Sequence, residues 1–302
     1  MSGVAFTSLR GTTELWRAEL VRGLRRLRAG DLGHAERHFV HAHRCAPERP
    51  EVCFALGQER LRRGLAAEAE PLLRAAWDGD KTLVAAACAL ARCLAKGDQL
   101  DEAHAILDEA SEKNGPVIAI EVVRGEMFLD DGRPAEARAA ALAALALADG
   151  DGASTGSRQT GRAASRALLS RVENQSGIDL AADGHMDAAV FAFKRATDLD
   201  PEWSGPVTNL GAALARMGRF SPARAAYERA IAIDPENPLP HLNLGLLLRD
   251  HGHLCAAARA FETALDLGPD PADAAAALSA LATVDAEAAR RRGKIGPPPN
   301  VS

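Results

Sequence analysis

The sequence predicts an all-α protein made of repeated helix–turn–helix units, and three observations support this fold class. The 302 residues are 47% hydrophobic but only 4% aromatic, and alanine is abundant. Alanine has the highest helix propensity, and its small side chain lets helices approach closely. Prolines recur every 34 residues, at Pro201, Pro235 and Pro269. A period of this length is typical of helical solenoids, in which neighbouring helix pairs stack to bury their apolar faces.

Other residue types keep the same interval. Aromatic rings recur at Phe193, Tyr227 and Phe261, and a Leu-Gly pair ends at Gly211 and again at Gly245. This pattern resembles the tetratricopeptide repeat, a 34-residue helix–turn–helix with Leu-Gly in its first helix and alanine, an aromatic residue, alanine and proline at fixed later places. The resemblance implies a right-handed α-solenoid of about seven helix–turn–helix repeats, closed by a C-terminal capping helix.

The repeat register divides the chain into a run of four units and a run of three. The first run is expected at residues 16–151, with units that start at Trp16, Pro50, Val84 and Ile118. The second run is expected at residues 170–271, with units that start at Ser170, Ser204 and Pro238. The remaining segments are predicted to be an N-terminal extension at 1–15, a capping helix at 272–292 and a disordered tail at 293–302.

The two runs are out of register by 18 residues. A further step of 34 from Ile118 would start a unit at Gly152, whereas the next unit starts at Ser170. The slip coincides with Gly150–Ser157, whose glycine and serine content is typical of a flexible loop. Residues 152–169 are therefore predicted to be a Gly/Ser-rich insertion followed by an extension of the next helix.

Charge and cysteine content restrict the class of protein further. The net charge is -5 and no concentrated basic face is evident, so a nucleic-acid partner is not expected. Five irregularly spaced cysteines do not suggest a disulfide framework. Neither a signal peptide nor a run long enough to insert into a membrane is found. We expect a cytoplasmic protein with reduced cysteines.

The sequence contains no catalytic or phosphate-binding motif, so we expect neither an enzyme nor a cofactor. One cluster leaves an alternative open. The histidines His34, His38 and His41 are spaced to form a stripe on one helix, with Cys45 one further step along. Such a stripe could bind a transition metal, although a polar outer helix face that uses histidine is the more ordinary explanation. The first helix also has many arginines, which suggest either a solvated end of the solenoid or a docking patch for an acidic partner.

In the family that the chain resembles, the first helix of each unit lines a concave groove. The positions that point into the groove are the second, fifth, sixth, ninth, twelfth and thirteenth of each unit. In the C-terminal run these positions include Arg171, Asn174, Gln175, Thr208, Asn209, Arg216, Leu242, Asn243, Arg249 and Asp250. In the N-terminal run they include Leu20, Leu24, Leu27, Phe54, Gln58, Cys88, Arg92, Val122, Glu126 and Leu129. The C-terminal half of the groove is therefore expected to be polar and rich in amides, and the N-terminal half more apolar.

Asn209 and Asn243 share the sixth position, and their surroundings are similar to the repeats of O-linked N-acetylglucosamine transferase. In those repeats a ladder of asparagines holds a peptide main chain. A carboxamide offers both a donor and an acceptor, so it can pair with a backbone amide regardless of side chains. Gln175 could extend the ladder. The alternative is that these amides bond within the solenoid.

The predicted function is a non-catalytic scaffold or adaptor that binds a peptide or another protein in its groove. Two alternatives stay open: a component that self-associates into homo-oligomers, and a metal-binding or regulatory subunit of an enzyme. Members of the family that capture acidic chaperone tails use a lysine at the fifth position. No lysine occupies that position here, so this kind of capture is disfavoured.

Overall fold

The structure is a computed structural model that describes residues 5–150 and 155–294. These residues form fifteen α-helices and no strand, which confirms the all-α solenoid of helix pairs. The first eight helices are α1 (Ala5–Arg28), α2 (Leu32–Cys45), α3 (Pro50–Arg62), α4 (Ala66–Gly79), α5 (Val84–Lys96), α6 (Leu100–Asn114), α7 (Ile118–Asp130) and α8 (Pro134–Asp149). The others are α9 (Thr155–Ala182), α10 (Met186–Leu199), α11 (Ser204–Arg216), α12 (Phe220–Ile233), α13 (Pro238–Asp250), α14 (Leu254–Asp266) and α15 (Pro271–Lys294).

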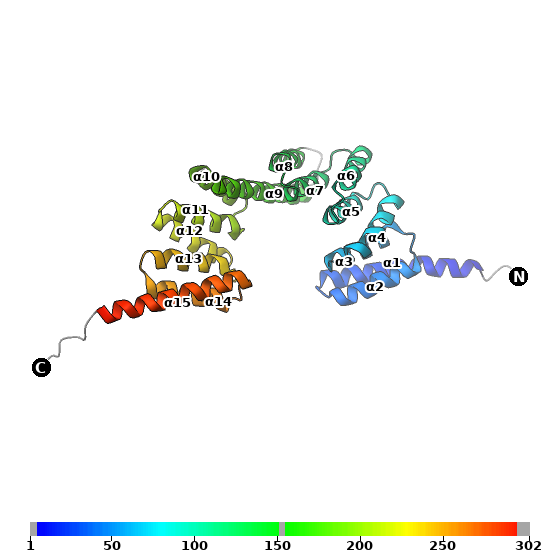
Figure 1. Ribbon diagram of the computed structural model, residues 1–302. Coiled ribbons are helices and arrows are strands. Elements are labelled where there is room, and N and C mark those ends of the chain that lie inside the picture. The colour runs from blue at the N-terminus through cyan, green and yellow to red at the C-terminus, as the bar shows by residue number, and fades with distance from the viewer. Residues whose placement is uncertain (1–4, 151–154, 295–302) are drawn as a thin grey trace. The chain divides into compact units, whose positions relative to one another are not determined.

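The helices form two compact units that meet within α9, between Leu168 and Leu169. In the N-terminal unit, α1 packs with α2, α3 with α4, α5 with α6 and α7 with α8, and each pair packs on the next (Figure 1). In the C-terminal unit, α11 packs with α12 and α13 with α14, and α15 covers the last pair. Each pair buries on its neighbours the apolar face that it could not bury alone.

A glycine in the first helix lets the two helices of a pair come into close contact. A β-carbon at Gly245 would lie 2.5 Å from the Phe261 ring, and one at Gly211 would lie 2.6 Å from the Tyr227 ring. Both rings are buried. The Leu-Gly pair and the aromatic residue of the sequence pattern are therefore the two sides of one packing contact.

The turn between the helices of a pair requires a residue with positive φ. In the pair α11/α12 this residue is Gly218, at φ 72°. In the pair α5/α6 the equivalent residue is Asp98, at φ 62°. A non-glycine residue is strained in this left-handed region, so the third repeat is less well suited to its turn than the others.

The predicted loop at Gly150–Ser157 is only partly a loop. Residues 151–154 lie outside the described residues, but Thr155, Gly156 and Ser157 already belong to α9. At the C-terminus, α15 reaches Lys294, so the first two residues of the predicted disordered tail are helical. The rest of that tail, 295–302, and the first four residues of the N-terminal extension lie outside the described residues.

The register slip is explained by the length of α9, which has 28 residues. A slip of 18 residues equals about five turns at about 3.6 residues per turn. Residues 18 apart on α9 therefore share a face of this helix.

The first half of α9 takes the place of the next first helix in the N-terminal unit. A β-carbon at Gly161 would lie 2.8 Å from Ile118 at the start of α7, and one at Gly125 would lie 2.6 Å from Leu168. Leu168 is 2% exposed. In the repeats α11/α12 and α13/α14, an aromatic ring of the second helix fills the space beside the first-helix glycine. In the fourth repeat, Leu168 of α9 fills this space.

None of the helices in the described ranges is both long enough and apolar enough to cross a membrane.

Candidate functional site

Two cavities formed by described residues lie on the face of the N-terminal unit that its first helices form. The smaller cavity, of about 210 Å³, lies between α1 and α3. Its lining includes Leu20, Leu24 and Leu27 from α1 and Phe54 from α3, with Gln58 and Arg62 at positions further along α3. Leu24 is 40% exposed. All of these residues occupy positions that the repeat register places on the groove face, with Arg62 at the thirteenth position of the unit that starts at Pro50.

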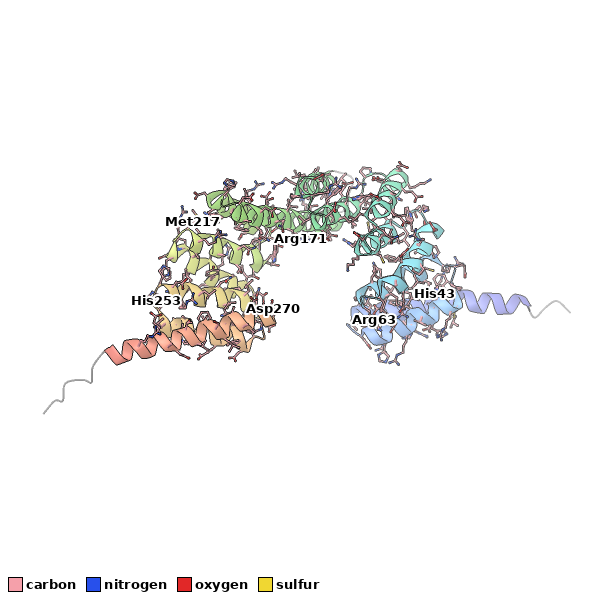
Figure 2. All side chains as sticks on the ribbon, in the orientation of Figure 1. His43, Arg63, Arg171, Met217, His253 and Asp270 are labelled. Carbon is pink, nitrogen blue, oxygen red and sulfur yellow. The ribbon has the colours of Figure 1, made fainter. Side chains whose placement is uncertain are left out.

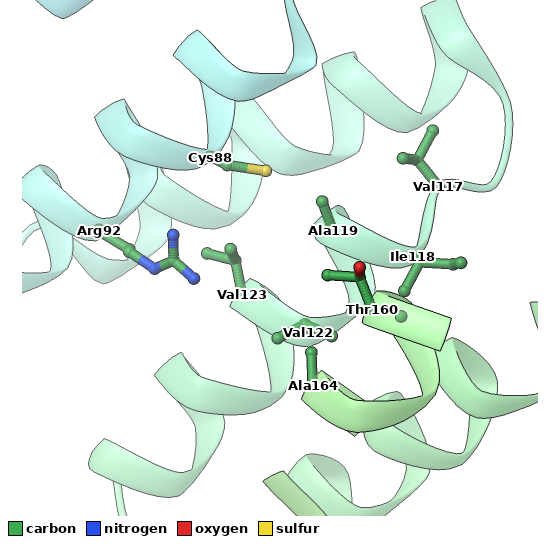
Figure 3. A pocket seen from close by; sticks show the side chains of 10 residues that line it. Cys88, Arg92, Val117, Ile118, Ala119, Val122, Val123, Thr160 and Ala164 are labelled. Atoms are coloured by element: carbon green, nitrogen blue, oxygen red, sulfur yellow. The ribbon is translucent and has the colours of Figure 1, made fainter. Parts of the chain in front are cut away.

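The larger cavity, of about 370 Å³, lies between α5, α7 and the first half of α9 (Figure 3). Cys88 of α5 and Val122 of α7 face it, as predicted from the repeat register. The wall contributed by α9, at Thr160, Gly161 and Ala164, was missed by the sequence analysis because this segment was assigned to an insertion. The coincidence of an 18-residue slip with five helical turns is the signal that could have indicated it.

The polar groups around the larger cavity are already satisfied. Arg92 forms an ion pair with Glu126, with Nη2 and Oε2 2.8 Å apart. The Thr160 hydroxyl donates to the Gly156 carbonyl at 3.0 Å. Burial raises the pKa of the Cys88 thiol to about 11, so the thiol is neutral at physiological pH and forms part of an apolar wall. The cavity therefore suits an apolar group.

The amides predicted for the C-terminal unit are arranged differently from a uniform ladder. Asn209 donates from Nδ2 to Asn174 Oδ1 at 2.9 Å, so part of its capacity is used within the solenoid. Gln175 donates to Asp179 on its own helix at 2.9 Å. Asn243 is half-buried and, in the described part of the chain, forms no hydrogen bond through its side chain. Only Asn243 keeps all of its carboxamide available.

Thr208 and Leu242, which were predicted to face the groove, are buried instead, at 3% and 4% exposure. They occupy the fifth position of their repeats, where Cys88 and Val122 of the N-terminal unit are also buried but line a cavity. The Thr208 hydroxyl donates to the Ser204 carbonyl one turn earlier, at 3.0 Å. Asn174 at the same position is also buried, at 9%. Neither Thr208 nor Leu242 is accessible to a partner in this conformation.

The predicted arginines of the C-terminal unit make local contacts. Arg216 donates to the carbonyl of Ala181 near the end of α9, at 3.2 Å. Arg249 donates to the carboxylate of Asp250 beside it, at 2.8 and 2.9 Å. Arg171 lies on α9 and Met217 follows the end of α11 (Figure 2). The hydrogen bond from Arg216 to Ala181 therefore links the second repeat of this unit to the first.

The histidine stripe is tied to carboxylates. His34 Nδ1 lies 2.8 Å from Asp31, the residue that caps α2. His38 Nδ1 lies 2.7 Å and His41 Nδ1 3.7 Å from the same oxygen of Glu19, which is buried on α1. The hydrogen bond from His38 lowers the pKa of Glu19, as does its contact with Arg22. Within the described residues, no group of three or more His, Cys, Asp or Glu side chains is arranged to hold a metal ion.

Comparisons with known proteins agree with this architecture. A family model described as TPR repeat matches residues 211–252, and one described as tetratricopeptide repeat matches residues 60–117. Tetratricopeptide repeats are therefore present in both units. No curated protein matches the sequence.

Solved structures of low sequence identity share the fold. A tetratricopeptide repeat protein from Parabacteroides merdae is 15% identical, with a TM-score of 0.54, over 90% of this chain and 99% of that one. PilF of Pseudomonas aeruginosa is 18% identical, with a TM-score of 0.54, over 79% of this chain and 97% of that one. A monomeric mutant of IFIT1 with Gppp-AAAA is 14% identical, with a TM-score of 0.60, over 92% of this chain and 64% of that one. At these identities the similarity shows the helical fold alone, and the function must be argued from the surface.

Proposed function

We propose that this chain is a non-catalytic adaptor that binds a segment of another protein on the first-helix face of its N-terminal unit. The observation that supports this most directly is the pair of apolar cavities on that face. They lie two repeats apart, one between α1 and α3 and the other between α5, α7 and α9. Tetratricopeptide repeats generally serve as protein-interaction modules, and the cavities indicate where this one would make contact.

The size of the cavities favours side chains of a partner over a free small molecule. Small-molecule sites usually enclose about 300–1,000 Å³ and surround most of the ligand. The cavity at α1 is smaller than this range, at about 210 Å³, and the other is at its lower end, at about 370 Å³. Buried apolar anchors that fill separate pockets are the usual source of affinity in protein interfaces. Two such pockets on one face suit one segment with two anchoring side chains.

The C-terminal unit has a polar surface of its own, which we propose as a separate contact. Asn243 has a free carboxamide, and Asn209 keeps its oxygen free after donating to Asn174. These two amides could pair with the main chain of a bound segment. The ladder predicted from the sequence is thereby reduced to Asn243 and half of Asn209, because Gln175 is turned to Asp179 and Thr208 is buried.

The experiment compares what the tagged full chain co-purifies from its source cells when each cavity is altered by an uncharged side chain. Leu24→Gln changes the smaller cavity and Ala119→Gln the larger one. Both residues are exposed, so the fold should tolerate the changes. The matched control is Leu142→Gln, because Leu142 is 51% exposed on α8 and lines neither cavity.

We expect the two cavity variants to lose the partner that the wild type and Leu142→Gln retain, with unchanged helicity by circular dichroism. If a partner binds all four proteins equally, it does not use this face and the proposal is wrong. The single variant Asn243→Ala, compared with the wild type in the same co-purification, then tests the polar contact separately.

A further inference from the structure

The first-helix face of the N-terminal unit has a row of cations beside its cavities. The last residues of α1, α3 and α5 are Arg28, Arg62 and Lys96, spaced 34 residues apart and all exposed. Each lies four residues, or about one turn, after a residue that lines a cavity. Arg28 follows Leu24, and Arg62, itself a lining residue, follows Gln58.

The third member keeps the same arrangement, because Lys96 follows Arg92 in the wall of the larger cavity. The corresponding residue of α7 is Asp130, so the row ends at the third repeat. Cations at helix C-termini also complement the helix dipole. The helix dipole, however, does not require these three residues to lie on the same side of their helices, next to the cavities.

The row has an excess of positive charge. Within the described part of the chain, neither Arg28 nor Lys96 forms an ion pair. Arg62 pairs with the buried carboxylate of Glu59, whereas Arg63, 3.3 Å from the same carboxylate, also pairs with Glu36 at 2.8 Å. Among the residues that line the two cavities, Glu51 is the sole acid. An apolar surface bordered by the unpaired cations Arg28 and Lys96 favours a partner with the opposite charge.

We propose that the occupant of this face is an acidic segment of a partner protein that carries two large apolar side chains. This inference rests on the proposed function and adds the chemistry of the partner. The apolar side chains fill the two cavities, and the carboxylates lie along Arg28, Arg62 and Lys96. Packed helices are spaced by about 8–10 Å, so cavities two repeats apart are separated by roughly 20 Å. That distance corresponds to about 13 residues of a helical segment or about six of an extended one.

The test uses a displayed library of random peptides of about 20 residues, long enough for either spacing, selected against the immobilised full chain. Enriched peptides are then measured against Leu24→Gln, Ala119→Gln and three further forms of the chain. These forms are the wild type, the charge-reversed Arg28→Glu with Lys96→Glu, and a control with Arg37→Glu and Arg44→Glu. The control has the same change in net charge, and its two residues are exposed on α2 and line neither cavity.

We expect enriched peptides to be acidic, to contain two large apolar residues, and to bind the wild type and the control equally. They should bind the Arg28→Glu, Lys96→Glu form roughly tenfold more weakly at low salt, because two favourable charge contacts become repulsive. The difference should shrink as the salt rises from about 50 to about 300 mM.

Three results would overturn the inference. Peptides without acidic bias that are blocked by Leu24→Gln would leave the proposed function intact and remove the acidic partner. Acidic peptides that bind the charge-reversed form as tightly as the control would do the same. A library that yields no peptide sensitive to Leu24→Gln or Ala119→Gln would count against both proposals.

Discussion

The contact between Gly245 and Phe261 allows a quantitative test of how the helix pairs are held together. In Gly245→Ala, the new β-carbon would lie 2.5, 2.7 and 3.0 Å from three atoms of the Phe261 ring. This ring is fully buried, so it has no space into which to move. Overpacking of this kind costs about 1–3 kcal/mol, whereas alanine gains about 0.8–1 kcal/mol over glycine in a helix interior. The expected net loss is therefore about 0–2 kcal/mol, which leaves Gly245→Ala about 1–3 kcal/mol less stable than a glycine-to-alanine change in a helix interior without this contact.

Urea unfolding followed by circular dichroism at the helix band measures this loss, and Gly33→Ala is the control. A β-carbon at Gly33 has nothing within 4 Å, so its replacement should not destabilise the chain. A second variant, Phe261→Leu combined with Gly245→Ala, should recover about 1 kcal/mol relative to the sum of the single changes. The reason is that the third repeat already joins Ala91 to Leu107 at these two positions, and both are fully buried. If Gly245→Ala behaves like Gly33→Ala, or if the double variant is simply additive, the proposed contact does not hold the pair together.

Three further predictions concern the N-terminal unit. Leu168→Ala should lower the free energy of unfolding by about 2–4 kcal/mol in urea, because it empties the space beside Gly125; a loss below about 0.5 kcal/mol would mean that α9 is not part of this core. Asp98→Gly should raise the free energy of unfolding by about 0.5–1 kcal/mol, because glycine adopts the left-handed conformation without strain and this gain exceeds the cost of its greater entropy in the unfolded state. A lower melting temperature would contradict the strain argument. The pKa of Glu19 is below its ordinary value of 4.5, so its stabilising effect is present above that value and is lost as the pH falls through the folded pKa. Glu19→Gln should therefore be less stable than the wild type at about pH 6, and the difference in stability should shrink as the pH falls below the ordinary pKa of 4.5. A difference that is independent of pH would show that ionisation plays no part.

Much of the fold could be predicted because the same residue types recur at the same interval in several repeats. The helices α3, α5, α7, α11 and α13 begin at Pro50, Val84, Ile118, Ser204 and Pro238, where the residue spacing had indicated unit starts. Each start is supported by several residue types that keep the same interval. The contact of Gly245 with Phe261 shows why, because each needs the other at a fixed distance along the chain.

The segment between the two runs could not be predicted in the same way. Its glycines and serines suggest a loop, but from Thr155 onward the chain is helical and packed through Gly161 and Leu168. Glycine lowers helix propensity by only about 1 kcal/mol. Contacts with α7 and α8 outweigh that cost, and such contacts are invisible to local composition.

The sequence predicted which residues share the groove side of the first helices, but it did not predict how exposed they are. The apolar N-terminal face was expected from Leu20, Leu24 and Phe54, and the cavity there confirms that these residues meet. The burial of Thr208 and Leu242 was missed, because the repeat register fixes which side of a helix a residue occupies and not how closely the next repeat approaches. The bond between Asn174 and Asn209 likewise depends on the distance between neighbouring helices.

Site-specific photocrosslinking in the source cells tests the central claim most directly. A photoreactive amino acid at Gln58, exposed on α3 at the smaller cavity, should form a covalent adduct with the partner protein. The same group at Leu142, exposed on the second helix α8, should not. Adducts at Leu142 without adducts at Gln58 would show that the partner binds a different surface, and the account of this face would be wrong.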